Sequence, residues 1–240
     1  MVILARMSAA EEIEIPTVDG PMPALQWLPP AGRGPGILLL QEIFGLSSYV
    51  RDRAAALADR GYVVVAPALY WRLGETAVDE TRPDYLEHAI GLMSRLDWGA
   101  TIDHASAALT AVNDLDEVDD GVGIVGFCFG GGVGFNVAAI ADPDAFVCYY
   151  GSAVPGLLGL ADRVTAPSIY HFGLDDAYIP PDVVEAICDA VPAGAEFHTY
   201  PGAGHAFDNP LPAFHSAAAS ATAWAATADF LARALPVRSS

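Results

Sequence analysis

The fold is decided by the stretch Val122-Gly-Ile-Val-Gly-Phe-Cys-Phe-Gly130. Its apolar run up to Phe127 predicts a buried strand, and the pattern that follows predicts a helix over residues 130–140. Between them, Gly126-Phe-Cys-Phe-Gly130 fits the pattern Gly-x-nucleophile-x-Gly. In such an elbow the nucleophile sits on a sharp, strained turn, and the flanking glycines let the strand and the helix approach closely. We therefore expect Cys128 at a strand-to-helix turn.

Two interpretations of Cys128 are open. A free cysteine is often simply a buried residue of the core. At an elbow, however, the N–H groups of the helix N-terminus favour a thiolate and any oxyanion formed nearby. The glycine pattern continues into Gly131 and Gly132 and favours the functional interpretation. Cys148, in an expected strand, and Cys188, in an expected helix, are interpreted as core residues.

The rest of the chain alternates between short apolar runs and helical patterns. After an N-terminal hairpin with strands at 11–18 and 24–28, strands are expected at 36–41, 62–66, 122–127, 146–150, 168–172 and 196–200, and helices at 47–60, 98–115, 130–140, 181–190 and 214–235. Residues 70–97 are irregular, with a helix expected after Pro83. This alternation predicts a three-layer α/β fold, in which helices flank a mostly parallel central sheet of about seven or eight strands.

We expect a single domain over residues 1–240. Met7 is an alternative start, in which case residues 1–6 form an N-terminal extension. The N-terminus lacks the basic region of a signal peptide, and no apolar run reaches the 18 residues of a membrane span. The three cysteines are odd in number and far apart, which fits a reducing compartment. The expected location is the cytoplasm.

Charge narrows the possible partners. The chain has 11 Lys and Arg against 30 Asp and Glu, which gives a net charge of −19. A field of this sign disfavours binding to nucleic acids and to anionic membranes. The expected partner is a small-molecule substrate, and the chain is expected to be a monomer or a small homo-oligomer.

No cofactor or metal site is predicted. The segment Gly121-Val-Gly-Ile-Val-Gly126 satisfies Gly-x-Gly-x-x-Gly. Its glycines lie before and within the expected strand, whereas a dinucleotide-binding motif follows the strand and opens a helix. The cysteines also lack the spacing of zinc ligands.

Two loops after later strands carry a candidate base and the acid that orients it. In the open α/β-hydrolase arrangement the chain order is nucleophile, acid, histidine. The loop after strand 168–172 offers Asp175 and Asp176, and the loop after strand 196–200 offers His205. Because the carboxyl ends of parallel strands meet at one edge of a sheet, we expect these groups close to the thiol.

A third loop reaches the same edge of the expected sheet. Gln41-Glu-Ile-Phe-Gly45 ends a strand, and an acidic side chain directly after four apolar residues is awkward unless it faces the site. Glu42 is therefore a candidate site residue. In this arrangement the same turn supplies one oxyanion N–H, and the residue after the nucleophile supplies the other. We nominate the amides of Ile43 and Phe129.

Together these segments resemble the dienelactone hydrolase (carboxymethylenebutenolidase) family of the α/β-hydrolase fold over nearly the whole chain. The resemblance is carried by Gln41-Glu-Ile-Phe-Gly45, Gly126-Phe-Cys-Phe-Gly-Gly131, Gly173-Leu-Asp-Asp-Ala-Tyr-Ile-Pro180 and Gly204-His-Ala-Phe207.

The resemblance implies a hydrolase of small esters or lactones with a Cys-Asp-His triad and an acyl-enzyme or enol-ester intermediate. The spacing Gly-x-x-Asp-x-x-x-Pro selects Asp176 over Asp175 as the triad acid, beside Cys128 and His205. By the same resemblance, Glu42 helps to take the thiol proton once substrate arrives.

The resemblance also implies an anionic lactone whose carboxylate is held by two arginines. Arg82 lies about where the first is expected, but the stretch past His205 reads Ala206-Phe-Asp-Asn209 and contains no arginine. Asp208 would repel a carboxylate. We therefore expect hydrolysis of esters or lactones with a reduced preference for anionic ones.

The walls of the site and the function class leave alternatives open. Trp71, Tyr85 and Trp98 lie in or next to the irregular segment, where they are candidates for an apolar pocket and equally for core positions. A catalytically weak relative that senses a small ligand is a rival to the enzyme, as is a redox-responsive protein in which Cys128 is oxidised. The complete order of the triad favours the enzyme.

Overall fold

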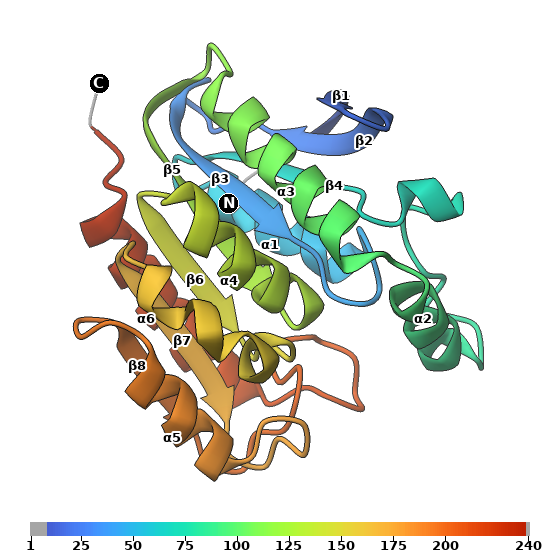
Figure 1. Cartoon of the computed structure of the whole chain (residues 1–240). Coiled ribbons are helices and arrows are strands. Elements are labelled where there is room, and N and C mark those ends of the chain that lie inside the picture. Colours follow the sequence, from blue (N-terminus) through green and yellow to red (C-terminus); the bar gives the residue numbers. More distant parts are fainter. Residues whose placement is uncertain (1–8, 239–240) are drawn as a thin grey trace, which may run out of the picture.

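The computed structural model of the chain describes residues 9–238, so the proposed extension of residues 1–6 lies outside it. Its centre is an eight-stranded sheet with the strand order β1-β2-β4-β3-β5-β6-β7-β8 (Figure 1). The strands are β1 (Ala10–Thr17), β2 (Gly20–Trp27), β3 (Gly34–Leu40), β4 (Val63–Pro67), β5 (Val118–Phe127), β6 (Ala145–Tyr149), β7 (Ser168–Gly173) and β8 (Glu196–Tyr200).

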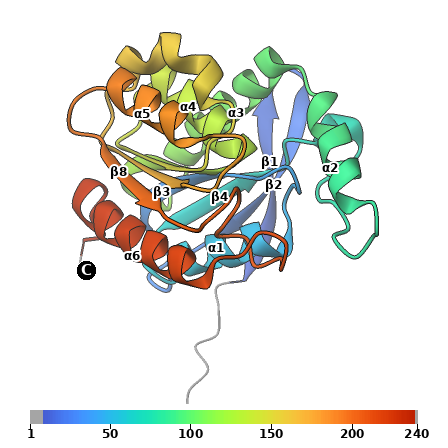
Figure 2. The same ribbon diagram turned by 90° about the horizontal axis from the view of Figure 1, so that it is seen from below.

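Helices cover both faces of this sheet. They are α1 (Ser48–Ala58), α2 (Tyr85–Ser94), α3 (Trp98–Asn113), α4 (Phe129–Ala141), α5 (Pro181–Ala190) and α6 (Ala217–Ala234), with the 3-10 segments η1 (Trp71–Leu73) and η2 (Val154–Arg163). Figure 2 shows α1 and α6 on one face of the sheet and α3, α4 and α5 on the other, while α2 stands outside both layers. The predicted three-layer α/β fold is confirmed.

Most neighbouring strands of the sheet are parallel, as expected for strands that helices cover on both faces. From β3 to β8 every neighbouring pair is parallel, and only β1–β2 and β2–β4 are antiparallel. Strands covered on both faces are continuous apolar runs, as in Ile37-Leu-Leu-Leu40, whose side chains are fully buried. Burial of each such side chain contributes roughly 1.5–3 kcal/mol.

Most elements lie where the sequence predicts them. The N-terminal hairpin is present, with Thr17 opposite Gly20, and α2 follows Pro83 as expected. The predicted start of the last helix at Phe214 is wrong, because the Phe214 N–H bonds to the Leu211 carbonyl in a turn and the helix begins only after Ser216. None of the helices within residues 9–238 is both long and apolar enough to cross a membrane.

The backbone around Cys128 has no room for additional side-chain atoms. Cys128 itself has φ 51° and ψ −113°, a strained conformation for a residue with a Cβ. A Cβ on Gly126 would lie 2.3 Å from the Gly130 carbonyl oxygen, and one on Gly130 would lie 2.3 Å from the Leu40 carbonyl oxygen. The glycines of the elbow thus let β5, α4 and β3 meet at one point.

We predict that Gly126→Ala lowers the free energy of unfolding by about 1–3 kcal/mol, because backbone atoms must shift to admit the methyl group. Gly156→Ala is the matched control, because a Cβ at Gly156 in η2 meets nothing within 4 Å. Urea unfolding of the two variants measures the difference. Equal stability of both variants would show that the elbow is not tightly packed.

Candidate active site

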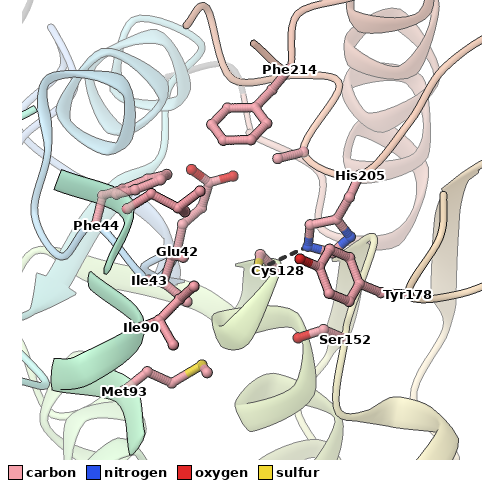
Figure 3. A pocket seen from close by; sticks show the side chains of 12 residues that line it. Glu42, Ile43, Phe44, Ile90, Met93, Cys128, Ser152, Tyr178, His205 and Phe214 are labelled. Carbon is pink, nitrogen blue, oxygen red and sulfur yellow. Dashed lines mark hydrogen bonds between the residues drawn. The ribbon is translucent and has the colours of Figure 1, made fainter. Parts of the chain in front are cut away.

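Three residues from the carboxyl edge of the sheet form one line of hydrogen bonds. Cys128 lies between β5 and α4, Asp176 in the loop after β7, and His205 in the loop after β8. The His205 Nε2 is 3.1 Å from the Cys128 Sγ, and its Nδ1 is 2.7 Å from the Asp176 Oδ2. Figure 3 shows the imidazole turned toward the sulfur. The chain order nucleophile, acid, histidine therefore corresponds to direct contact in space.

The Asp176 carboxylate is fixed by its own loop. Its Oδ1 accepts hydrogen bonds from the backbone N–H groups of Tyr178 (2.8 Å) and Ile179 (3.3 Å), which leaves Oδ2 for the imidazole. The side chain is buried, whereas the neighbouring Asp175 is exposed. Of the two aspartates that the sequence offered, Asp176 is the one that contacts His205.

The electrostatics of the site favour a charged imidazole. Burial lowers the pKa of His205, but its hydrogen bonds to Asp176 and Cys128 outweigh burial and raise the pKa to about 10. At neutral pH the imidazolium is therefore the favoured form. This charged ring lies 3.1 Å from the Cys128 Sγ.

Glu42 lines the same cavity, but both of its carboxylate oxygens bond to residues other than Cys128. Its Oε1 accepts a hydrogen bond from the Tyr150 hydroxyl (3.1 Å) and its Oε2 accepts one from the Asn209 Nδ2 (2.7 Å). Burial raises the pKa of Glu42 to about 7 in spite of these two bonds. At neutral pH the carboxyl group is therefore present in both its charged and its neutral form.

The two nominated oxyanion amides lie in segments that are tied together. The turn after β3 closes through a hydrogen bond from the Gly45 N–H to the Glu42 carbonyl, and the Gly130 N–H of the elbow donates to the Gln41 carbonyl at 2.9 Å. Within residues 9–238, the turn and loop hydrogen bonds of the backbone do not use the N–H groups of Ile43 or Phe129.

A cavity of about 300 Å³ opens above the thiol. It is lined by Glu42, Ile43, Phe44, Leu86, Ile90, Met93, Cys128, Ser152, Tyr178, His205, Ala206 and Phe214 (Figure 3). Apolar side chains from α2 and from the loops after β3 and β8 make up most of its wall. Among residues 9–238, no group of three or more His, Cys, Asp and Glu side chains is placed to hold a metal ion.

The structure does not place the other predicted substrate-binding residues in the cavity. Arg82 is exposed and pairs with Asp84 at 2.8 Å. Trp71 packs against His104, with 5.6 Å between the ring centroids, and does not line the cavity. Tyr85 packs against Phe44 at 5.7 Å, behind the cavity wall. The irregular segment has no periodicity from which the direction of these side chains could be predicted.

The expected repulsion by Asp208 is also corrected. Its carboxylate does not line the cavity. It is buried behind the site and bonded to Arg53, Tyr49 and Ser220. The arginine is contributed by α1, 155 residues earlier in the chain. Because its charge is already paired, Asp208 is not the group that a substrate would meet. Sequence reasoning missed this pair and the two groups that hold Glu42, since no local pattern connects them.

The sheet order, the strained elbow and the three loops at one edge define an α/β hydrolase. The Dienelactone hydrolase family model matches residues 22–235. A carboxymethylenebutenolidase of Pseudomonas putida is 33% identical over 226 residues, which cover 92% of this chain and 96% of that protein. One of Rhodococcus opacus is 34% identical over 233 residues, which cover 91% and 89%.

The similarity extends to three dimensions. The crystal structure of a putative dienelactone hydrolase from Klebsiella pneumoniae superimposes with a TM-score of 0.83 at 28% identity, and the match covers 95% of this chain and 100% of that one. The chain belongs to the dienelactone hydrolase family. It is accordingly a hydrolase of the lactone and ester class.

The burial of Glu42 leads to a prediction about stability. The pKa rises from 4.5 to about 7 on folding, so the stability of the wild type falls as the pH increases through this window. Relative to the wild type, Glu42→Gln should gain on the order of 3 kcal/mol between pH 4.5 and pH 8. Urea unfolding at both pH values measures the difference.

The matched control is Glu87→Gln, which removes an exposed carboxylate from α2. Its difference from the wild type should stay within about 0.5 kcal/mol at both pH values. A difference for Glu42→Gln that does not change with pH would contradict the burial of a carboxyl group that titrates near neutrality.

Proposed function

We propose that the protein is a cysteine-dependent hydrolase of small esters or lactones, with Cys128 as nucleophile, His205 as acid and base, and Asp176 as the group that orients His205. The observation that supports this proposal is the continuous line from Sγ through the imidazole to the Asp176 carboxylate, with contacts of 3.1 and 2.7 Å. This arrangement meets the requirement that nucleophile, base and orienting group lie within hydrogen-bond reach of each other.

In the first half of the reaction the Cys128 thiolate attacks the carbonyl carbon of the substrate. The amides of Ile43 and Phe129 stabilise the oxyanion that forms. The His205 imidazolium then gives its proton to the departing alkoxide, and a thioester remains on Cys128. If the substrate is a lactone, the same step opens the ring and the alcohol stays attached to the acyl group.

In the second half, neutral His205 removes a proton from water, which attacks the thioester. The acid product leaves, and the imidazolium–thiolate pair is restored. Asp176 holds the imidazole in one orientation through both halves, because its second oxygen is fixed by two backbone N–H groups.

For Glu42 we propose a supporting role that depends on movement. Its carboxyl group lies in the cavity, held by Tyr150 and Asn209. When Cys128 is still protonated, Glu42 can take the thiol proton and so produce the attacking thiolate, but only after its side chain has left these two partners. A substrate that enters the cavity beside Glu42 is the event that exchanges these contacts.

We predict that Cys128→Ala and His205→Ala each lower kcat/KM for a neutral aryl ester by about 10³-fold or more. Because the two residues act as a unit, the double variant should be scarcely slower than either single one. Initial rates of ester hydrolysis measure all three. Losses that multiply in the double variant would mean that the two residues act independently.

The role of Asp176 in orienting His205 is tested by the same substitution at two adjacent aspartates. Asp176→Asn should lower the rate severely, since the amide cannot stabilise the imidazolium in the same way. Asp175→Asn changes an exposed side chain, and its rate should stay within a few-fold of the wild type. The opposite ranking would show that Asp175, and not Asp176, orients His205.

A further inference from the structure

The wall of the cavity opposite the triad is formed by one face of α2. Leu86, Ile90 and Met93 are spaced i, i+4 and i+7 and all line the cavity. Leu86 and Ile90 are also among the few large apolar side chains that are exposed, 39% and 45% respectively. A helix that stands outside both layers of the fold thus presents apolar side chains to the space in front of Cys128 (Figures 1 and 3).

The remaining wall is apolar as well. Phe44, from the turn after β3, and Phe214, from the loop before α6, lie 6.1 Å apart between ring centroids and face the cavity with Tyr178. These side chains come from three separate parts of the chain. An apolar group bound in front of the thiol is therefore enclosed by α2 and by aromatic rings.

The cavity lacks the charges that an anionic substrate requires. The chain contains no lysine, and no arginine within residues 9–238 lines the cavity. Arg82 is paired with Asp84 at the surface, and Arg53 with Asp208 behind the site. In the described part of the chain, the cationic group at the cavity is His205, and both of its nitrogens already have partners.

A carboxylate placed in this cavity has no partner that compensates for its loss of water. Desolvation of an unpaired ion costs several kcal/mol, and a bidentate arginine is the usual compensation. Glu42 adds a further acidic group to the same wall. A neutral apolar group, in contrast, gains about four-fold in binding for each CH₂ it buries.

We infer that the cavity selects neutral esters and lactones with a small apolar acyl chain or ring, and that Leu86 and Ile90 on α2 determine this specificity. The inference rests on the proposed function, because it names the substrate class of the same site. The volume of about 300 Å³ is at the small end of ligand cavities, which span ~300–1,000 Å³. Small substrates are therefore favoured.

The first test measures the preference of the cavity for apolar chains without catalytic turnover. Maleimides that carry N-methyl, N-butyl or N-hexyl groups alkylate thiols, and peptide mapping by mass spectrometry follows each cysteine separately. The rate at Cys128 should rise at least about ten-fold from methyl to hexyl, as partial burial of the chain predicts. The interpretation of Cys188 as a core residue is wrong, because its side chain is exposed on α5. It therefore serves as the internal reference, where the rate should change by no more than about two-fold.

A variant that adds a cation to the wall sharpens this test. Ile90→Arg should reduce the chain-length effect at Cys128 and raise kcat/KM for a carboxylated lactone, relative to its methyl ester, by about ten-fold. Ile140→Arg is the matched control, since it places the same charge at a 51% exposed isoleucine near the far end of α4. That control should keep both ratios of the wild type.

The outcomes separate the two claims. Equal chain-length dependence at Cys128 and Cys188, or a wild-type preference for the carboxylated lactone over its methyl ester, overturns the inferred substrate class. Ester hydrolysis that persists in Cys128→Ala overturns the proposed function instead, and the alkylation rates then decide the ligand class of the cavity on their own.

Discussion

The contact between three backbone segments at the elbow is the constraint on which the site depends. Gly126 and Gly130 allow β5, α4 and β3 to approach so closely that a single Cβ would lie 2.3 Å from a carbonyl oxygen. This approach sets the direction of the Cys128 side chain and brings the turn with Ile43 beside the N-terminus of α4. The thiol and the two amides proposed for the oxyanion hole are therefore positioned by backbone packing, and not by flexible side chains.

Strain is concentrated around the same point. Among the described residues, four that are not glycine have positive φ, and three of them are Cys128, Tyr150 and Ala206. Tyr150 donates to Glu42, and Ala206 follows the histidine directly. Such conformations cost about 1–3 kcal/mol each and persist only where the surroundings enforce them. Here the buried sheet below the loops provides that support.

The polar groups behind the cavity form a second, connected layer. Glu42 is bonded to Tyr150, whose hydroxyl lies 3.3 Å from that of Tyr49, and Tyr49 in turn donates to Asp208. Arg53 completes the chain of contacts from the other side. A buried carboxyl group with a pKa of about 7 is tolerated at Glu42 because every polar neighbour in this layer has a partner.

The parts of this arrangement that the sequence predicted are those that follow from period and topology. Apolar runs and helical patterns identify the sheet, and parallel strands bring the loops of Cys128, Asp176 and His205 to one edge. The directions of Trp71 and Arg82 could not be predicted, because an irregular segment has no periodicity. The pairing of Asp208 with Arg53 joins residues 155 positions apart and leaves no local signal.

The wall formed by α2 illustrates the same limit. A helix after Pro83 was predictable, but its side chains reach the cavity only because α2 stands outside both layers, beside the carboxyl edge of the sheet. The inferred substrate class therefore depends on a placement that only the three-dimensional structure provides, whereas the proposed chemistry depends on motifs that the sequence already contains.

The most direct test of the central claim is the detection of the acyl group on the enzyme. The wild type is mixed with a neutral aryl ester and quenched in acid within one turnover, and its peptides are then weighed by mass spectrometry. Our account predicts the mass of one acyl group on the peptide that contains Cys128, as a thioester that hydroxylamine removes. Continued hydrolysis with no acyl group on Cys128, or with the acyl group on another residue, would contradict it.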